Sequence, residues 1–359
     1  MNTRDSELVA GLFLEKGYKL VDSFEEADII LFNTCSVREN AENRVWGNLG
    51  MLRKIKRKNP DLIIGVIGCM AQKFKRELFH RSDLVDIVCG PSDEENLPGL
   101  VAECLKNKNK VLSVDNINKP RKEIFPEYRL NRISAYVSIS HGCNNFCSYC
   151  IVPYVRGREV SRKPEDIMHE IKILAKKGIK EVILLGQNVN SYKPDFIHLL
   201  EKINAIDGIE RIRFMTSHPK DANEKLFKAM RGLSKVCEHL HLPIQSGSDK
   251  ILKLMNRGYT VKQYLNLVKK LRKIAPECRL TTDIIVGFPG ETDADFKKTC
   301  NIMKKVQFDA AYLFKYSSRL PTAASKMKDN VTQEEKEKRH LELLKLQREI
   351  SKKRPRRSI

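Results

Sequence analysis

From residue 135 onward the chain repeats one pattern six times, in which a short apolar run is followed by a longer amphipathic segment. The short runs predict β-strands and the amphipathic segments predict α-helices. Strand–helix repeats favour a parallel sheet covered by helices, and six of them fit a partial (β/α)6 barrel that is open on one side. The strands are expected at 135–140, 181–185, 211–217, 240–244, 280–287 and 310–316, and the helices between them near Pro164, Pro194, Asn223, Ser248 and Thr292.

The N-terminal third also alternates helix and strand patterns. Helices are expected at 5–16 and 41–58, and buried strands at 28–33, 62–68 and 86–89. This order predicts an open parallel-sheet α/β domain ahead of the barrel. Cys35 and Cys69 lie just past the ends of the first two strands, where sites form in such sheets. The two cysteines are therefore expected to face one crevice.

We divide the chain into four parts. Residues 1–115 form the N-terminal domain, and residues 116–132, which are polar and contain prolines, form a linker. Residues 133–330 form the barrel. Residues 331–359 form a C-terminal helix and a basic tail, with Thr332 as the expected N-cap of the helix.

Three cysteines directly follow the first barrel strand, with the spacing Cys143-x-x-x-Cys147-x-x-Cys150. Active sites of such barrels lie in the loops after the strands. A 4Fe–4S cluster has four irons, so three thiolates leave one iron open for another ligand. Zinc is one alternative, but a zinc site usually needs a second pair of ligands, and the sequence has no second Cys-x-x-Cys or His-x-x-x-His pair. His141 is too close to Cys143 to chelate the same ion. Three buried structural cysteines are the other alternative.

The balance of charged residues indicates which class of molecule the chain binds. The chain carries 66 Lys and Arg against 45 Asp and Glu, a net charge of +21, which attracts polyanions such as nucleic acid. Lysine-rich codon usage is the alternative explanation, and the basic runs at 53–58 and 352–357 could each be a solvated face or tail.

The cysteine content and the lack of targeting signals indicate the cellular compartment in which the chain works. No apolar run reaches the roughly 18 residues of a membrane span, and the N-terminus lacks a signal-peptide pattern. Ten cysteines in a chain without an export signal indicate a reducing, cytoplasmic environment and metal ligation rather than disulfides.

Polar and glycine residues follow the other barrel strands. Gln187 and Asn188 follow the second strand, Gln245 the fourth, Gly287 the fifth and Arg319 the sixth. Together they suit a polar, nucleoside-sized ligand, whereas singly each could only make a turn or cap a helix, as Ser248 and Asp249 could. His218, after the third strand, is either functional or a packed or capping histidine. No catalytic residue is assigned.

The cysteine spacing, with Tyr149 just before the last cysteine, resembles the radical S-adenosylmethionine (radical SAM) superfamily. The resemblance implies that the open iron is chelated by the amino and carboxylate groups of SAM. It also implies that electron transfer into SAM releases a 5′-deoxyadenosyl radical. Tyr149, Gln187, Asn188, Gln245, Gly287 and Arg319 are the residues expected to contact SAM.

Three segments, 33–42, 68–72 and 142–158, closely resemble the methylthiotransferase family, and in particular the branch that acts on isopentenyl-modified adenosine in tRNA. This implies that the radical removes hydrogen from C2 of the adenine beside the anticodon, and that a second SAM donates the methyl group. A second 4Fe–4S cluster, on Cys35 and Cys69, would supply sulfur. Sister branches, which modify threonylcarbamoyl-adenosine or a ribosomal protein, remain the alternative.

Two family features fall outside the printed chain. The third cysteine of the second cluster would lie two residues before Met1, and the RNA-binding TRAM domain would follow residue 350. Three explanations would account for the third cysteine: a start codon further upstream, a chain that is a fragment, or a substitute ligand such as Cys89. The expected partners are a tRNA anticodon loop and an electron donor such as flavodoxin or ferredoxin, and the chain is expected to be monomeric and not to bind membranes. An inactive truncated homologue that binds only RNA or one cluster is the alternative.

Overall fold

The computed structural model describes residues 1–36, 39–114, 117 and 125–353. Val37, Arg38, most of the expected linker and the basic tail after residue 353 lie outside the described residues. The chain forms two compact units. Unit 1 contains residues 1–132, 141–143 and 151–159, and unit 2 contains residues 133–140, 144–150 and 160–359.

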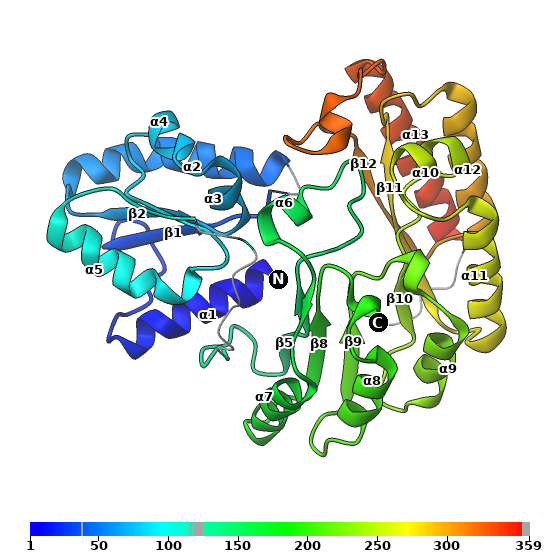
Figure 1. Ribbon diagram of the computed structural model, residues 1–359, viewed down its shortest axis with the longest axis horizontal. Coiled ribbons are helices and arrows are strands. Elements are labelled where there is room, and N and C mark those ends of the chain that lie inside the picture. The colour runs from blue at the N-terminus through cyan, green and yellow to red at the C-terminus, as the bar shows by residue number, and fades with distance from the viewer. Residues whose placement is uncertain (37–38, 115–116, 118–124, 354–359) are drawn as a thin grey trace. The chain divides into compact units, whose positions relative to one another are not determined.

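Unit 1 is built on a four-stranded sheet in the order β1-β2-β3-β4, with every neighbouring pair parallel (Figure 1). The predicted open parallel α/β domain is therefore confirmed. Its elements are α1 (Asn2–Glu15), β1 (Ile29–Asn33), α2 (Glu39–Lys58), β2 (Ile63–Ile67), α3 (Cys69–Phe74), α4 (Glu77–Arg81), β3 (Ile87–Cys89), η1 (Glu94–Asn96), α5 (Leu97–Asn107), β4 (Val111–Ser113) and α6 (Val152–Arg156).

The alternating side chains of β2 pack on both faces of this sheet. Ile64 and Val66 lie in a core with Leu49 and Leu52 of α2. Residues on the other face pack with α1 and α5. Burial on both faces explains why β2 reads as a continuous apolar run. The short strand β4 and the helix α5 that precedes it were not predicted.

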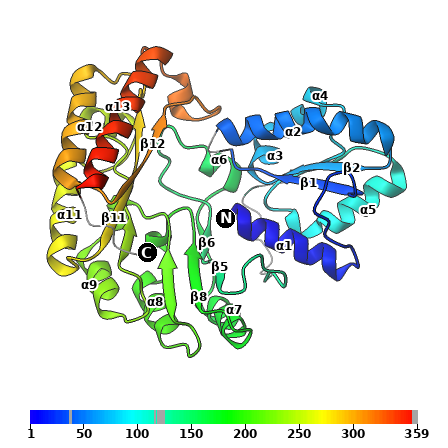
Figure 2. The ribbon, with the colours of Figure 1, turned by 180° about the vertical axis from the view of Figure 1, so that it is seen from behind.

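Unit 2 contains six parallel strands in two three-stranded sheets, β5-β8-β9 and β10-β11-β12 (Figure 2). A parallel bridge joins Ile212 of β9 to Val236, three residues before β10, and the six strands with their helices form the expected partial barrel. The strands of these two sheets are β5 (Ser134–Ser138), β8 (Glu181–Leu185), β9 (Arg211–Phe214), β10 (His239–His241), β11 (Arg279–Val286) and β12 (Ala310–Lys315). Two further short strands are β6 (Ser140–His141) and β7 (Val160–Ser161).

Helices follow the strands of unit 2, and those of nine residues or more bury one apolar face each against one large core. They are α7 (Pro164–Lys176), η2 (Val189–Ser191), α8 (Phe196–Asn204), η3 (Pro219–Asp221), α9 (Glu224–Gly232), α10 (Asp249–Leu254), α11 (Val261–Ile274), α12 (Asp293–Val306), η4 (Ala323–Lys326) and α13 (Gln333–Lys352). None of the described helices is long and apolar enough to span a membrane.

Some predicted boundaries were wrong for identifiable reasons. The fourth barrel strand was expected at 240–244 but ends at His241, because Pro243 has no N–H for a sheet ladder. The third ends at Phe214, two residues before Thr216 adopts a left-handed φ of 71°. Asp195, rather than Pro194, precedes α8 and caps it.

Predicted N-caps had mixed outcomes. Thr332 caps α13 through its side chain, as expected. Asn223 and Thr292, near which helices were expected to begin, cap α9 and α12. Ser248 occupies the N-cap position of α10, but its hydroxyl donates to Asp295 at 2.7 Å instead of capping the helix. Asp249 accepts a bond from the backbone N of Val261 at 2.6 Å, so it joins α10 to α11.

Candidate functional site

The cysteine loop begins at a position where the surrounding backbone leaves no room for a side chain. Gly142 has a φ of 75°, and a Cβ there would lie 1.9 Å from the carbonyl oxygen of Arg158. The next residue, Cys143, is buried, and its backbone N donates to the carbonyl of Gly157 at 3.1 Å. This part of the loop belongs to unit 1. Two backbones in close approach therefore fix the start of the loop.

Cys147 and Cys150 lie in unit 2, on one tight turn in which the N of Cys150 donates to the carbonyl of Cys147 at 2.9 Å. Within the described residues, no three His, Cys, Asp or Glu side chains are arranged as ligands of a single metal ion. A cubane cluster makes a different demand, because each thiolate binds its own iron. All ten cysteines are present as thiols in the described part of the chain.

Arg257 lies directly against the cysteine turn. Its Nη1 donates to Sγ of Cys147 at 3.1 Å and to the hydroxyl of Tyr149 at 3.4 Å. Its Nε donates to the hydroxyl of Tyr259 at 3.0 Å, and Nη2 donates to the carbonyl of Pro243 at 3.1 Å. Burial works against the charged guanidinium, but Tyr149, Tyr259 and Cys147 raise its pKa well above the usual range. The turn therefore faces a fixed positive charge.

Tyr149 packs its ring with a small apolar cluster that includes Ile251, Met255 and Phe288. Burial is the main cause that raises the pKa of its phenol well above the ordinary value, so the hydroxyl stays protonated at neutral pH. The residue is thus a neutral aromatic next to the cysteines.

Buried polar atoms without hydrogen-bond partners gather where the strands of unit 2 end. One is Ser140 Oγ, at the start of β6. The others lie in the loops after β8, β9 and β10 and are Gln187 Oε1, Asn188 Oδ1, Ser217 Oγ, His218 Nε2 and Gln245 Oε1. Burying one such atom without a partner costs about 1–3 kcal/mol, so six of them near the strand ends of unit 2 need an explanation. A polar ligand bound there supplies one.

Gln245 is also held in an unusual backbone conformation. Its φ is 71°, a left-handed value that costs a non-glycine residue about 1–2 kcal/mol. Its backbone N donates to the carbonyl of Asp283 at 2.9 Å, and its carbonyl accepts from the N of Ile285 at 3.0 Å. The neighbouring strand β11 therefore enforces the conformation that places this side chain, which is typical of ligand sites.

Asn188 and His218 each have one side-chain polar atom in a hydrogen bond and one buried polar atom without a partner. Asn188 donates through Nδ2 to Asp221 at 2.7 Å, which leaves its oxygen without a partner. His218 accepts at Nδ1 from the backbone N of Lys220 at 3.2 Å and so caps η3, as the capping alternative predicted. Burial, followed by Arg257 and Lys220, lowers the pKa of His218 to about 2. The ring is therefore neutral with its proton on Nε2, where it forms an unmatched buried donor.

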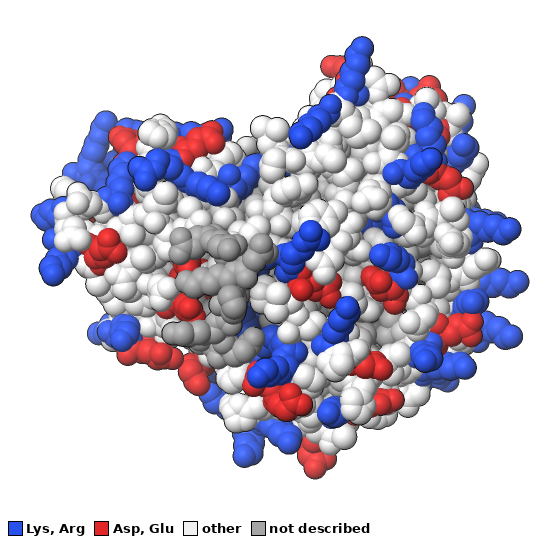
Figure 3. All heavy atoms as spheres, in the orientation of Figure 1, with Lys and Arg blue, Asp and Glu red and all other residues white. Residues whose placement is uncertain are grey.

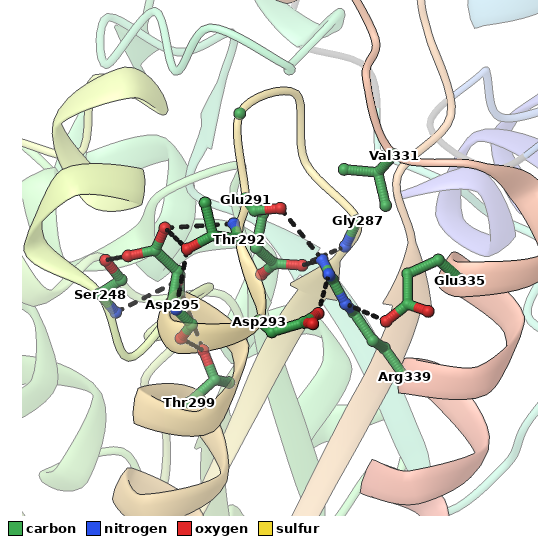
Figure 4. Close-up of polar contacts among 12 residues, drawn as sticks. Ser248, Gly287, Glu291, Thr292, Asp293, Asp295, Thr299, Val331, Glu335 and Arg339 are labelled. Atoms are coloured by element: carbon green, nitrogen blue, oxygen red, sulfur yellow. Dashed lines mark hydrogen bonds and ion pairs between the residues drawn. The ribbon is translucent and has the colours of Figure 1, made fainter.

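The loop after β11 carries Gly287 and is fastened by charged groups (Figure 4). The N of Gly287 donates to Oε2 of Glu291 at 2.7 Å, and Nη1 of Arg339 donates to the same oxygen at 2.9 Å. Burial raises the pKa of Glu291, against the lowering effects of the Gly287 N–H and Arg339. Arg339 also pairs with Asp293 at 2.7 Å and with Glu335 at 2.9 Å. Helix α13 thereby holds this loop in place.

Arg319 is 6% exposed, and its carbonyl accepts a bond from the N of Thr322 at 2.8 Å. This contact shows how its loop turns after β12. Its expected contact with SAM stays a prediction.

Cys35 and Cys69 follow neighbouring strands of unit 1. The register pairs Asn33 at the end of β1 with Ile67 at the end of β2, so both cysteines emerge at one edge of the sheet. Cys69 is buried and Cys35 is half-buried. Burial raises the pKa of the Cys69 thiol, while Arg156 lowers it and nearby Cys35 raises it further.

Cys89 does not join them. It is fully buried in the core beneath α1 and α5, and its thiol donates to the carbonyl of Gly90 at 3.5 Å. The structure therefore favours a buried free cysteine at this position over the substitute ligand that the sequence analysis considered.

Sequence reasoning missed two arginines that contact these cysteines. Arg257 lies between α10 and α11, and Arg156 at the end of α6 donates to Sγ of Cys69 at 3.1 Å. An arginine in a polar connection reads as surface charge. Arg156 could have been noticed because it lies within the 142–158 segment, whereas no sequence signal marks Arg257.

Comparison with known proteins gives the family. Residues 137–303 match the Radical SAM superfamily, and residues 1–90 match Uncharacterized protein family UPF0004. Two solved structures share the fold at 14% identity. The first is the radical S-adenosylmethionine methyltransferase TsrM from Kitasatospora setae, with a TM-score of 0.64 over 89% of this chain and 73% of that chain. The second is the cobalamin-dependent S-adenosylmethionine radical enzyme OxsB, with a TM-score of 0.59 over 96% of this chain and 53% of that chain.

Much closer relatives are found by sequence. The tRNA-2-methylthio-N(6)-dimethylallyladenosine synthase of Caldicellulosiruptor saccharolyticus is 52% identical over 98% of this chain and 76% of its own length. The enzymes of the same name from Thermoanaerobacter sp. and Clostridium botulinum are 51% and 48% identical to this chain. The match covers 98% of this chain in both cases, and 76% and 80% of the two enzymes. The chain therefore belongs to the family of tRNA-2-methylthio-N(6)-dimethylallyladenosine synthases, which are radical SAM methylthiotransferases that use 4Fe–4S clusters and SAM.

Proposed function

We propose that this chain adds a methylthio group to C2 of N6-isopentenyl-adenosine beside the anticodon of tRNA. One observation carries the proposal. The cysteine turn after the first barrel strands is joined through Arg257 to Pro243, two residues from Gln245, at the edge where buried polar atoms lack partners. A site that combines thiols, a fixed cation and unmatched hydrogen-bonding groups suits a cluster with a polar nucleoside ligand.

The residues present fit these cofactors. Cys143, Cys147 and Cys150 would hold the first cluster, and Tyr149, Gln187, Asn188, Gln245, Gly287 and Arg319 would contact SAM. When bound, the cluster and SAM supply a 5′-deoxyadenosyl radical. The neutral Nε2–H of His218 can donate to SAM, while the oxygens of Gln187, Asn188 and Gln245 can accept from it. Cys35 and Cys69 would hold the second cluster, which supplies sulfur.

The division of labour follows the proposed domains. Residues 1–115 would serve the second cluster, with residues 116–132 as the linker. Residues 133–330 would form the radical SAM barrel, and residues 331–359 the closing helix and tail. In unit 2, α13 fastens the Gly287 loop through Arg339, so the closing helix also supports the proposed SAM site.

A basic surface on unit 1 supports tRNA binding. Figure 3 shows Lys and Arg side chains gathered over α2. Arg53 and Lys56 form ion pairs with Asp83 and Asp86, whereas Lys54, Arg57 and Lys58 are exposed and form no ion pair within the described residues. Such cations can meet phosphates. We further propose a flavodoxin or ferredoxin as electron donor, a monomeric state and a cytoplasmic location.

Anaerobic reconstitution tests the proposal. About eight irons per chain are expected for two clusters, and about four for one. SAM cleavage should stop in Cys147→Ala. Incubation with tRNA that carries isopentenyl-adenosine should give a methylthiolated nucleoside, whereas threonylcarbamoyl-adenosine should remain unchanged. Modification of the second nucleoside alone would overturn the substrate assignment.

A further inference from the structure

Arg257 is a buried cation that lacks a carboxylate. It is 5% exposed, and no ion pair within the described residues involves it. Three other buried arginines each contact a carboxylate: Arg156 at 2.7 Å, Arg162 at 2.7 Å and Arg339 at 2.9 Å. The partners of Arg257 are two phenols, one carbonyl and the sulfur of Cys147. Only that sulfur can readily become an anion when it ligates iron.

A buried guanidinium without an opposite charge destabilises the folded chain, so the protein needs a negative partner at this place. A cluster on three thiolates carries net negative charge, and reduction adds one more. We propose that Arg257 is the counter-ion of the cluster on Cys143, Cys147 and Cys150, and that its hydrogen bond to Cys147 raises the reduction potential of that cluster. This inference rests on the cluster assignment in the proposed function.

The physical basis is the difference between two oxidation states. A fixed cation and an N–H···S hydrogen bond stabilise the more negative, reduced state more than the oxidised state. The site is buried, so water and salt screen the interaction little. Arg257 would therefore make the cluster easier to reduce by its electron donor.

The cysteine turn and Arg257 are held together by a set of short bonds. The N of Ser148 donates to the carbonyl of Met255 at 3.0 Å, and its hydroxyl donates to the carbonyl of Leu254 at 2.8 Å. Asn256 donates to the carbonyl of Phe146 at 3.0 Å. The residues on both sides of Cys147 are thus tied to the residues just before Arg257. Such support is what a tuned contact requires.

Tyr259 fixes the other side of the guanidinium. Its hydroxyl accepts from Nε of Arg257 at 3.0 Å and donates to the carbonyl of Ile244 at 2.9 Å. Because every nitrogen of Arg257 has a fixed partner, lysine cannot reproduce this set. Arg257 is a positioning and tuning residue in this account, since it touches a ligand of the cluster and not the reacting atoms.

The test uses the full chain with Cys35→Ala and Cys69→Ala, so that only one cluster is present. Arg257→Gln, Arg257→Lys and the control Arg162→Lys are added to this parent. Arg162 is also buried in unit 2, where it pairs with the carboxylate of Glu170 and donates to the carbonyl of Ser138. Iron is counted, and the cluster is titrated by electron paramagnetic resonance at controlled potential.

At the potential where half of the parent cluster is reduced, Arg257→Gln should lower the ratio of reduced to oxidised cluster at least tenfold, which is about 59 mV for one electron. Arg257→Lys should lower it at least threefold, and Arg162→Lys should leave it unchanged. If Arg257→Gln fails to bind iron, the titration of Arg257→Lys against the parent becomes the test of the inference. Unchanged titrations in variants that bind four irons would overturn the inference alone. A parent that binds no cluster would overturn both the inference and the assignment beneath it.

Discussion

Arg156 and Cys69 meet in the interior of unit 1, where Nε of the arginine donates to Sγ of the cysteine across 3.1 Å. The same guanidinium pairs through Nη2 with Asp5 of α1 at 2.7 Å. One buried cation therefore joins a carboxylate from the first helix to the thiol that follows β2. In unit 2, Arg257 makes a contact of the same length to Cys147. Each proposed cluster site thus has an arginine directed at one of its sulfurs.

The first prediction concerns this buried pair. Arg156→Met should lower the free energy of unfolding of unit 1 by about 3–5 kcal/mol, because it leaves the carboxylate of Asp5 buried without its partner. The only tryptophan, Trp46, lies in α2, so its fluorescence during urea unfolding reports on unit 1. Adding Asp5→Asn should recover part of the loss, since the two residues are coupled. Strictly additive losses would contradict the ion pair.

The second prediction concerns pH. The folded pKa of His218 is about 2, against an ordinary 6.5, so the unfolded chain binds a proton between these values that the folded chain does not. Stability is therefore fully present above pH 6.5 and falls as the pH drops below it. Between pH 7.5 and 5, this histidine should remove about 2 kcal/mol from the stability of unit 2. Circular dichroism during urea unfolding measures the loss.

His218→Asn is the matched control for that pH effect. Asparagine can still accept the bond from the N of Lys220, but it does not titrate in this range. The variant should lose about 2 kcal/mol less than the wild type over the same pH interval. Equal losses would show that His218 is not the group responsible.

The third prediction concerns the start of the cysteine loop. In Gly142→Ala the added Cβ would meet the Arg158 carbonyl at 1.9 Å, where φ is already positive. The loop must shift, so reconstituted chains should bind less iron and lose more than about 1 kcal/mol of stability. Gly99→Ala in α5 is the control, because nothing lies within 4 Å of its added Cβ. That change should stabilise unit 1 slightly, and full iron binding in Gly142→Ala would refute the prediction.

The fourth prediction concerns the link between α13 and the Gly287 loop. Arg339→Gln removes the charge that holds Glu291, whose carboxylate accepts the N–H of Gly287 (Figure 4). We expect KM for SAM to rise about tenfold with a smaller change in kcat, because ground-state and transition-state binding are lost together. Arg348→Gln, on the exposed face of α13, should change neither constant. A fall in kcat at unchanged KM would argue against the role of this loop in SAM binding.

The regular elements were largely predictable from the sequence because their burial patterns are regular. The strand at 181–185 was predicted to the residue, since a buried parallel strand gives a compact apolar run bounded by polar residues. The helix that begins after Thr332 was predicted from its cap. By contrast, β4 was not predicted, because only Val111 of its three residues is buried and no apolar run marks the strand.

The site was predictable only where a residue type carries its own chemistry. The cysteines drew attention by their spacing. Arg257 and Arg156 did not, because the contact that makes each of them special joins it to a residue far away in the sequence, 110 positions for Arg257 and 87 for Arg156. The left-handed backbone of Gln245 was likewise invisible, since the pairing of its backbone with β11 imposes it.

Mass spectrometry of tRNA nucleosides tests the central claim most directly. The reconstituted chain is incubated with SAM, a reductant and tRNA that carries N6-isopentenyl-adenosine. The account predicts that this nucleoside exchanges one hydrogen for a CH3S group with the wild type, and stays unmodified with Cys147→Ala. An unmodified nucleoside from a wild-type preparation that binds iron and cleaves SAM would contradict it.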